Sequence, residues 1–221
     1  YVDVTFGGGG HSRAILERLG PKGRLIAFDR DRDAWANAPQ DERFTLVRSD
    51  FRWLRNHLRF LYALPVDGLL ADLGVSSHQF DTAGRGFSFR FEGPLDMRMD
   101  RRARRTAAEL LAGSDEHTLT TLLRTYGEVD GAHRVARQLV RAGAERRIRS
   151  TTDLVEALRP VTPRGRESSF LAQVFQALRI AVNDELGSLE ALLRQSAEVI
   201  RPGVRLCIIS YHSLEYRLCK N

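Results

Sequence analysis

The sequence predicts a doubly wound α/β fold with a mostly parallel sheet, into which a helical domain is inserted. Three observations predict it. Short apolar runs alternate with helical patterns from residue 1 to about residue 72, only helical patterns follow from about 106 to 166, and another apolar run comes near residue 205. Such alternation is typical of parallel strands joined by crossover helices. We expect a sheet domain of residues 1–101 and 173–221, and an inserted helical domain of residues 102–172.

The first apolar run leads into four glycines, Gly7 to Gly10, and then into a helical pattern. Glycine tolerates positive φ and lets the backbone lie against a ligand. A helix N-terminus adds free N–H groups and the positive end of the helix dipole. With Ser12 as the expected N-cap, this strand, turn and helix suit a nucleotide-like ligand. A flexible turn without a ligand is the alternative.

Acidic residues lie at or just past the ends of the next three apolar runs. Residues 24–28 are followed by Asp29, residues 44–47 by Asp50, and residues 66–71 by Asp72. The carboxyl ends of parallel strands share one edge of the sheet, where open α/β sheets bind ligands. Asp29 also lies nineteen positions after Gly10, a spacing at which a carboxylate accepts hydrogen bonds from both ribose hydroxyls.

The glycine pattern distinguishes two classes of cofactor. Dinucleotide-binding turns have glycine or alanine at the third conserved position. In this chain that position is Ser12 if the pattern starts at Gly7, and Arg13 if it starts at Gly8. The stretch Asp3-x-Thr5-x-Gly7-x-Gly9 instead resembles the motif with which S-adenosylmethionine enzymes hold the methionine ammonium group, with Asp3 as the acidic residue. We therefore favour a methyl donor over a nicotinamide.

The charge of the chain points to a polyanionic partner. Of 221 residues, 34 are basic and 28 acidic, which gives a net charge of +6, and only Lys22 and Lys220 are lysines. Arginine pairs bidentately with phosphate and stacks on bases. A genome biased toward arginine codons would explain the choice of arginine but not the positive excess.

Cysteine usage and hydropathy predict the compartment. Cys207 and Cys219 suit neither a disulfide scaffold nor a zinc site, so we expect a reducing cytosol and a cytoplasmic protein. No apolar run reaches about 18 residues, so no membrane partner is expected. The chain starts within a strand, lacks an initial methionine and stops before a sixth strand, so we expect both ends to be truncated.

Residues 85–100 mix aromatic and basic side chains. Phe87, Phe89 and Phe91 alternate near Arg85, Arg90 and Arg98. Aromatic faces and guanidinium planes stack on unpaired bases, although an edge strand with a buried phenylalanine face gives the same alternation. Asp96 and Asp100 have no histidine nearby, so a solvated or salt-bridged pair is expected there and no metal site.

The following segment is basic and helical. Helices are expected over residues 107–111, 119–126, 132–142 and 152–158, and residues 101–172 hold fourteen arginines and nine acidic residues. This composition suits an RNA-binding domain. An ordinary solvated helical surface is the alternative. One long helix from residue 170 to about 200 and a buried strand over 205–210 complete the pattern.

Seven blocks of the sequence resemble the bacterial 16S ribosomal RNA (cytosine-N4) methyltransferase family. They span nearly the whole chain in the order of the family. They are Asp3-x-Thr5-Phe6-Gly7-x-Gly9-Gly10-His11-Ser12, Phe28-Asp29-Arg30-Asp31, Asp72-Leu73-Gly74-Val75-Ser76-Ser77-x-Gln79, Arg85-Gly86-Phe87-Ser88-Phe89, Gly93-Pro94-Leu95-Asp96-Met97-Arg98-Met99-Asp100, Phe175-Gln176-Ala177-Leu178-Arg179-Ile180 and Ser210-Tyr211-His212-Ser213-Leu214-Glu215.

The resemblance implies a class I, Rossmann-like methyltransferase that uses S-adenosyl-L-methionine to methylate the N4 amine of a decoding-centre cytosine in 16S ribosomal RNA. Free RNA and the small ribosomal subunit both remain open as substrates, as does a homodimer. Asp72 is the expected catalytic residue. Cofactor contacts are expected from Asp3 and, by the resemblance, from Gly9, Gly10, His11, Asp29, Phe51, Asp72 and Gln79. Contacts with RNA are expected from Arg85, Phe87, Phe89, Arg98 and His212.

The sequence departs from the family at one position. An aspartate usually follows Ser-Leu-Glu in the last motif, and Tyr216 stands there in this chain. Two other functions are the alternatives. A hydrolase using Ser210, His212, Ser213 and Glu215 would lack the G-x-S-x-G turn. A non-catalytic RNA-binding module would give the acidic residues at the strand ends no role. Detectable cofactor binding would distinguish the enzyme from such a module.

Overall fold

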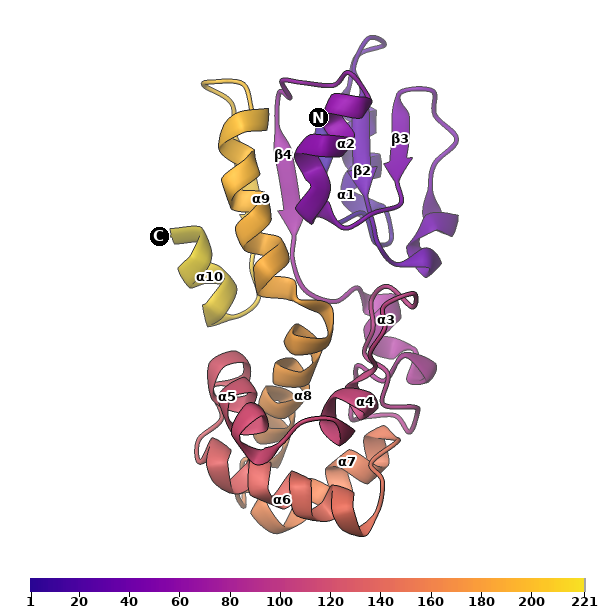
Figure 1. Ribbon diagram of the computed structural model, residues 1–221. Coiled ribbons are helices and arrows are strands. Elements are labelled where there is room, and N and C mark those ends of the chain that lie inside the picture. The colour runs from indigo at the N-terminus through magenta and orange to yellow at the C-terminus, as the bar shows by residue number, and fades with distance from the viewer. Residues whose placement is uncertain (221) are drawn as a thin grey trace. The chain divides into compact units, whose positions relative to one another are not determined.

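Five short apolar runs form one parallel sheet in the order β3-β2-β1-β4-β5 (Figure 1). The strands are β1 (Val2–Asp3), β2 (Leu25–Phe28), β3 (Phe44–Val47), β4 (Leu69–Asp72) and β5 (Leu206–Ile209). The chain starts at the central strand, builds outward to β3, and then crosses to β4 and β5. The strand order therefore reverses between β1 and β4, which is where doubly wound sheets bind ligands. The predicted fold class is confirmed.

The computed structural model describes residues 1–220, which form two compact units. The sheet unit comprises Tyr1–Ser76 and the chain from Glu185 onward, and the helical unit comprises Ser77–Asp184. The insertion expected at residues 102–172 lies inside the helical unit. That unit also holds residues 77–101 and 173–184, which the sequence pattern placed with the sheet.

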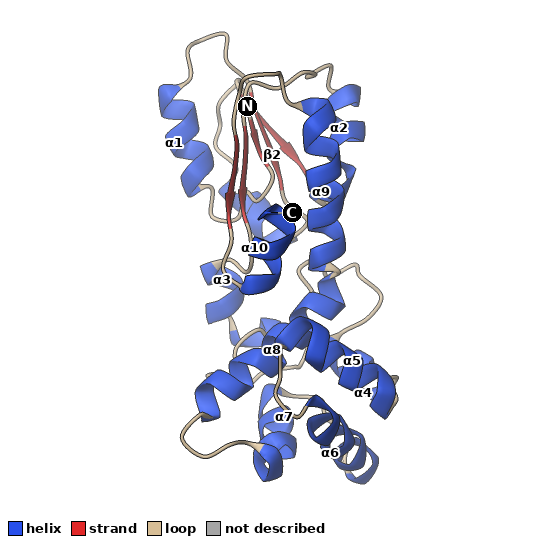
Figure 2. Ribbon diagram, turned by 90° about the vertical axis from the view of Figure 1, so that its left-hand side faces the viewer, coloured by secondary structure: helices blue, strands red, loops and turns tan. Residues whose placement is uncertain are grey.

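Helices cover both faces of the sheet. Figure 2 shows α1 (Gly10–Arg18) on one side of the strands, and α2 (Leu54–Phe60) and α9 (Glu185–Val199) on the other. The side chains of Leu54, Leu58, Leu189 and Leu192 are buried against the strands, in one core with Val2 and Ile26. Two 3-10 helices, η1 (Arg32–Asn37) and η2 (Phe51–Trp53), and α10 (Ser213–Lys220) complete this unit.

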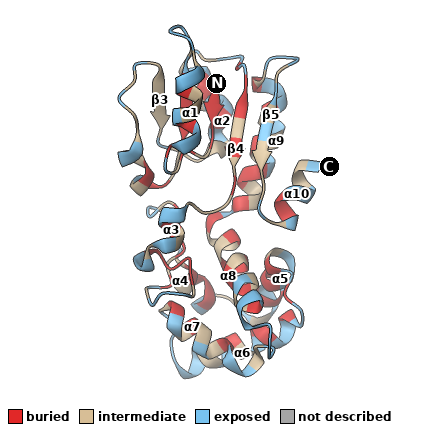
Figure 3. Cartoon of the chain, turned by 180° about the vertical axis from the view of Figure 1, so that it is seen from behind, coloured by how far each residue is buried: buried red, intermediate tan, exposed pale blue. Residues whose placement is uncertain are grey.

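The helical unit is built around α8 (Glu167–Asn183), which packs against α5 (Glu116–Gly127) and α4 (Ala107–Ala112). It also contains α3 (Ser77–Asp81), η3 (Ala83–Arg85), α6 (Ala132–Glu145), α7 (Thr151–Leu158) and η4 (Arg159–Val161). Capping boxes begin α4 at Thr106 and α7 at Ser150. In Figure 3 the buried residues of these helices face one another and the exposed ones face outward. The four predicted helices of this segment are present.

Three local expectations were wrong. The helix expected from 170 to 200 is broken at Asp184, whose φ of 47° is left-handed. The N-cap of α1 is Gly9, not Ser12, because the helix begins at Gly10; the buried Ser12 hydroxyl lies within its first turn and donates a hydrogen bond to Asp3. The outer strand β5 is only half-buried and exposes Cys207, so it is not a buried strand.

No helix among residues 1–220 is long and apolar enough to cross a membrane.

Candidate functional site

The carboxyl edge of the sheet brings together the ends of four strands. Asp3 ends β1, Asp29 follows β2, Asp72 ends β4, and Tyr211 comes two residues after β5. All four lie in the sheet unit, around the turn between β1 and α1. This is the edge at which the sequence placed the ligand.

The glycine turn takes its shape from two left-handed residues, Gly7 with φ 51° and Gly9 with φ 75°. A Cβ on Gly9 would lie 2.9 Å from the Phe6 ring, whereas Gly8 and Gly10 have no atom within 4 Å of that position. The space beside the backbone at Gly8 and Gly10 is therefore open, so that another molecule can lie close to it.

We expect Gly9→Ala to destabilise the protein by about 2–3 kcal/mol, because alanine resists positive φ and its methyl group meets the Phe6 ring. Gly8→Ala is the matched control, with an expected change within about 0.5 kcal/mol. Urea unfolding followed by circular dichroism measures both. Equal stabilities of the two variants would contradict the role of Gly9 in shaping the turn.

Asp3 is completely buried beneath this turn. One of its carboxylate oxygens accepts the Ser12 hydroxyl at 2.7 Å, and the other accepts the Thr5 N–H at 3.1 Å. Burial raises the pKa of Asp3, while these hydrogen bonds act in the opposite direction. Asp3 thus ties the first turn of α1 to the end of β1. Its predicted contact with a ligand ammonium group stays a prediction.

Asp29 connects the end of β2 to the glycine turn. Its Oδ2 accepts the N–H of Gly7 at 2.7 Å, and its Oδ1 accepts the N–H of Asp31 at 2.7 Å. Burial raises the pKa of Asp29 to about 6, although both hydrogen bonds lower it. The protonation state of Asp29 therefore changes near neutral pH.

Asp72 is the centre of a second cluster at the same edge. Its Oδ2 lies 3.2 Å from Nε2 of His11, and its Oδ1 accepts the Tyr211 hydroxyl at 2.8 Å. The N–H of Asp72 donates to the Thr5 hydroxyl at 2.6 Å. The hydrogen bond to Asp72 raises the pKa of Tyr211. The structure thus brings together His11 and Asp72, which the sequence had named separately.

Sequence reasoning missed Tyr211. Its signal was available, since Tyr211 lies in the last family motif and just past the fifth expected strand. Tyr211 carries no acidic group, so the pattern of acidic strand ends does not include it. The neighbouring His212, which the sequence predicts as a contact, has a side chain that is only 10% exposed and lies 3.2 Å from Glu215.

The region after β3 is held by ion pairs. Asp50 accepts a hydrogen bond from Arg30 at 2.7 Å and another from Ser188 at 3.1 Å. The Asp50 carboxylate therefore already has partners within the protein. Phe51 follows it, half-buried and packed against the hydrophobic core of the sheet unit. The predicted cofactor contact of Phe51 stays a prediction.

The other predicted site residues lie in the helical unit. Gln79 is buried in α3. Arg85 is 1% exposed and donates to the backbone oxygens of Arg98 at 2.9 Å and Met99 at 3.2 Å. Phe87 is also buried, and Phe89 packs edge-on against Phe175.

Arg98 is half-buried and forms a bidentate pair with Asp96 at 2.7 and 2.8 Å. Asp100 pairs with Arg102 at 2.9 Å, so both acidic residues of this loop form the expected salt bridges. Among residues 1–220, no three His, Cys, Asp or Glu side chains are grouped to hold a metal ion. The predicted contacts of Arg85, Phe87, Phe89 and Arg98 with RNA stay predictions.

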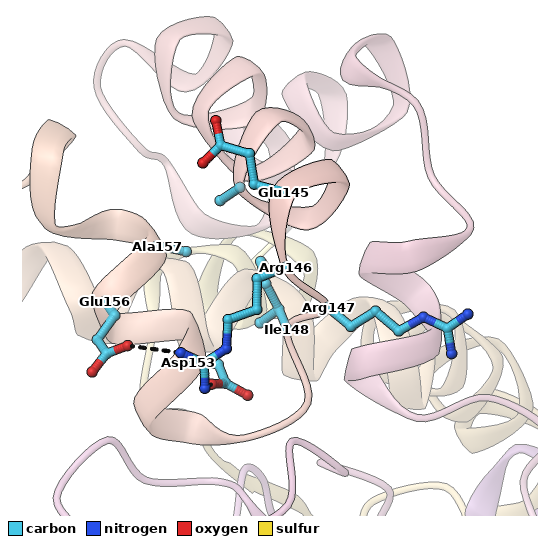
Figure 4. A pocket seen from close by; sticks show the side chains of 8 residues that line it. Glu145, Arg146, Arg147, Ile148, Asp153, Glu156 and Ala157 are labelled. Carbon is cyan, nitrogen blue, oxygen red and sulfur yellow. Dashed lines mark ion pairs between the residues drawn. The ribbon is translucent and has the colours of Figure 1, made fainter.

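A small crevice lies between α6 and α7. Its volume is about 120 Å³, well below that of a nucleotide site. Figure 4 shows Arg146 directed toward Asp153 and Glu156, whereas Arg147 points away. The charged groups that line the crevice are therefore paired with one another.

Comparison with known proteins decides the family. The model of the MraW methylase family matches residues 1–221. The chain belongs to this family. It is 54% identical to the ribosomal RNA small subunit methyltransferase H of Parabacteroides distasonis, over 100% of this chain and 73% of that protein. The proteins of the same name from Cytophaga hutchinsonii (53%, covering 74% of that protein) and Flavobacterium psychrophilum (50%, covering 76%) also match over all of this chain.

Family membership confirms the resemblance seen in the motifs. It also gives the class of reaction, since members of the family are methylases. The glycine turn, Asp29 and the cluster of His11, Asp72 and Tyr211 are thus the candidate active site of a methylase.

Proposed function

We propose that the chain is an S-adenosylmethionine-dependent methyltransferase that methylates the N4 amine of a cytosine in 16S ribosomal RNA, either free or within the small ribosomal subunit. One observation carries the proposal. Asp29 and the pair of His11 and Asp72 flank an open glycine turn at the point where the strand order reverses. The ribosomal RNA methyltransferase name of the relatives supports the substrate.

The residues around the turn fit an adenosyl cofactor. A carboxylate has about four lone-pair sites, and the Asp29 carboxylate uses one on each oxygen for a backbone N–H. Two sites remain for the hydroxyl groups of a ribose. Gly10 and His11 begin α1, whose free N–H groups favour an anionic group such as the carboxylate of methionine.

The bound cofactor would supply an electrophilic methyl group on a sulfonium centre. Asp72 would accept a hydrogen bond from the target amine and turn the nitrogen lone pair toward that methyl group. When the new N–C bond forms, the nitrogen must lose a proton, and the same carboxylate can take it. His11, 3.2 Å from Oδ2, would hold the carboxylate in place during this step.

RNA binding is assigned in this proposal to the helical unit, above all to residues 102–172. Its arginines are mostly exposed, among them Arg104, Arg105, Arg134 and Arg147. Guanidinium groups on a surface attract phosphates and make binding depend on salt. The buried Arg85 and Phe87 would have a supporting role beneath that surface.

The test is calorimetric titration with S-adenosylhomocysteine at several pH values. We expect micromolar binding by the chain and its loss in Asp29→Ala. Because Asp29 has a pKa of about 6 and binds hydroxyl groups best as a carboxylate, the dissociation constant should be constant above about pH 7. Below about pH 6 it should rise by up to about tenfold per pH unit.

Asp29→Asn should bind weakly and lose this pH dependence, whereas Asp130→Asn, an exposed aspartate of the helical unit, should keep it. A dissociation constant that does not change between pH 5 and 8 would contradict the role of Asp29. No binding at all by a folded chain would instead favour a non-catalytic RNA-binding module.

A further inference from the structure

Tyr211 is the exposed aromatic residue of the candidate active site. Its side chain is 68% exposed, yet its hydroxyl donates to Oδ1 of Asp72 at 2.8 Å. The ring also lies close to the loop after β4, because a Cβ on Gly74 would be 3.4 Å from Cδ2 of Tyr211. An exposed ring is thus fixed at its hydroxyl end and bordered by backbone on one side.

Two buried polar side chains hold the backbone that carries this ring. The N–H of Tyr211 donates to Oε2 of Glu215 at 2.8 Å, and Glu215 is buried. The other oxygen of Glu215 lies 3.2 Å from Nε2 of His212, and both side chains are largely buried. The N–H of Glu215 donates to Nδ1 of His212 at 3.4 Å. Hydrogen bonds of buried polar groups restrict a loop to one conformation, and in this loop that conformation exposes Tyr211.

The arrangement explains the polar residues of the last family motif. His212 and Glu215 face inward and act on the backbone, and Tyr211 faces outward at the ligand edge. Exposed aromatic rings next to a reactive group are the surfaces on which enzymes stack a base taken out of an RNA strand.

We propose that Tyr211 is the platform on which the target base stacks, and that its hydroxyl orients Asp72 toward the amine of that base. The inference rests on the proposed function and extends it by naming the residue that receives the base. Tyr211 and His11 each use one site on the Asp72 carboxylate. Since a carboxylate has about four such sites, the amine can still donate to it.

The two parts of the proposal predict different kinetics. Tyr211→Ala removes the ring and should raise KM for RNA by about 5- to 150-fold, the range for loss of one stacked base. Tyr211→Phe keeps the ring, so KM should change less than about threefold while kcat falls about tenfold. Tyr211→Trp should restore KM toward the original value. Tyr62→Ala, which removes an exposed tyrosine outside the site, is the control.

Two binding measurements accompany the kinetics. Titration with S-adenosylhomocysteine should give dissociation constants within about threefold for all variants, which shows that the cofactor site is folded. A stem-loop RNA with one fluorescent cytosine analogue should be quenched on binding by the original chain and by Tyr211→Phe, but not by Tyr211→Ala. Quenching needs no methyl transfer.

The outcomes separate the two proposals. An unchanged KM and unchanged quenching in Tyr211→Ala would overturn the stacking role, even if methyl transfer is normal. The same rise in KM for Tyr211→Phe as for Tyr211→Ala would overturn it too, because the ring would then have no effect of its own. If the original chain transfers no methyl group to RNA, the proposed function fails, and the quenching still decides the role of Tyr211.

Discussion

Asp72→Ala is expected to lower kcat for methyl transfer by about 10²- to 10⁴-fold, the range for loss of a positioned proton acceptor. The carboxylate holds His11 at 3.2 Å and Tyr211 at 2.8 Å, so its removal disperses the cluster. The dissociation constant for S-adenosylhomocysteine should also rise, because the family resemblance predicts that Asp72 contacts the cofactor as well. Transfer of a labelled methyl group to small-subunit RNA measures the first effect, and calorimetry the second.

Two controls separate a loss of chemistry from a loss of fold. Asp72→Asn keeps the shape of the side chain but not its charge, and we expect a comparable fall in kcat. Asp67→Ala removes an exposed aspartate that precedes β4 and pairs with Arg201, and its kcat should be unchanged. Normal turnover by Asp72→Ala would show that the amine needs no help from this carboxylate.

Arg85→Ala is expected to destabilise the helical unit by about 3–4 kcal/mol. The guanidinium group is 1% exposed, donates to two backbone oxygens of residues 98 and 99, and lies 5.7 Å from the centre of the Phe87 ring. Its removal leaves a cavity and unsatisfied carbonyl groups. Denaturant unfolding gives the free energy, with the exposed Arg104→Ala as the matched control.

Arg104→Ala should change the stability by less than about 0.5 kcal/mol and weaken RNA binding instead. The sequence pattern had assigned the RNA-binding role to Arg85. A variant Arg85→Ala that folds as stably as the original chain and binds RNA poorly would restore that assignment and contradict the structural role.

The fold was predictable because its signals are local. Each strand is a short apolar run, and because parallel strands end at one edge, the sequence alone predicts that Asp29 and Asp72 share that edge. The break at Asp184 was not predictable in this way. A left-handed aspartate lies within an otherwise continuous helical pattern, and nothing in its residue type distinguishes it from an aspartate on a helix surface.

The sequence also does not show which side chains are exposed to solvent. Arg85 and Arg98 look like RNA-binding arginines by type, and only packing shows that one is buried and the other is paired with Asp96. Tyr211 and His212 are adjacent in sequence, and only the position of Glu215 shows which of them faces solvent. A sequence pattern gives the edge of the sheet but not the direction of each side chain at that edge.

The order of the strands in the sequence has a consequence for synthesis of the protein. The segment Ser77–Asp184 lies between β4 and β5, so the ribosome makes the whole helical unit before β5, the outer partner of β4, exists. The chain between the end of β4 at Asp72 and the start of β5 at Leu206 takes roughly 7–27 seconds to make at about 5–20 residues per second. During that time the nascent chain exposes an unpaired strand edge next to apolar surface, which is a binding target for chaperones. Early folding of the helical unit cannot shorten this wait, because only translation delivers β5.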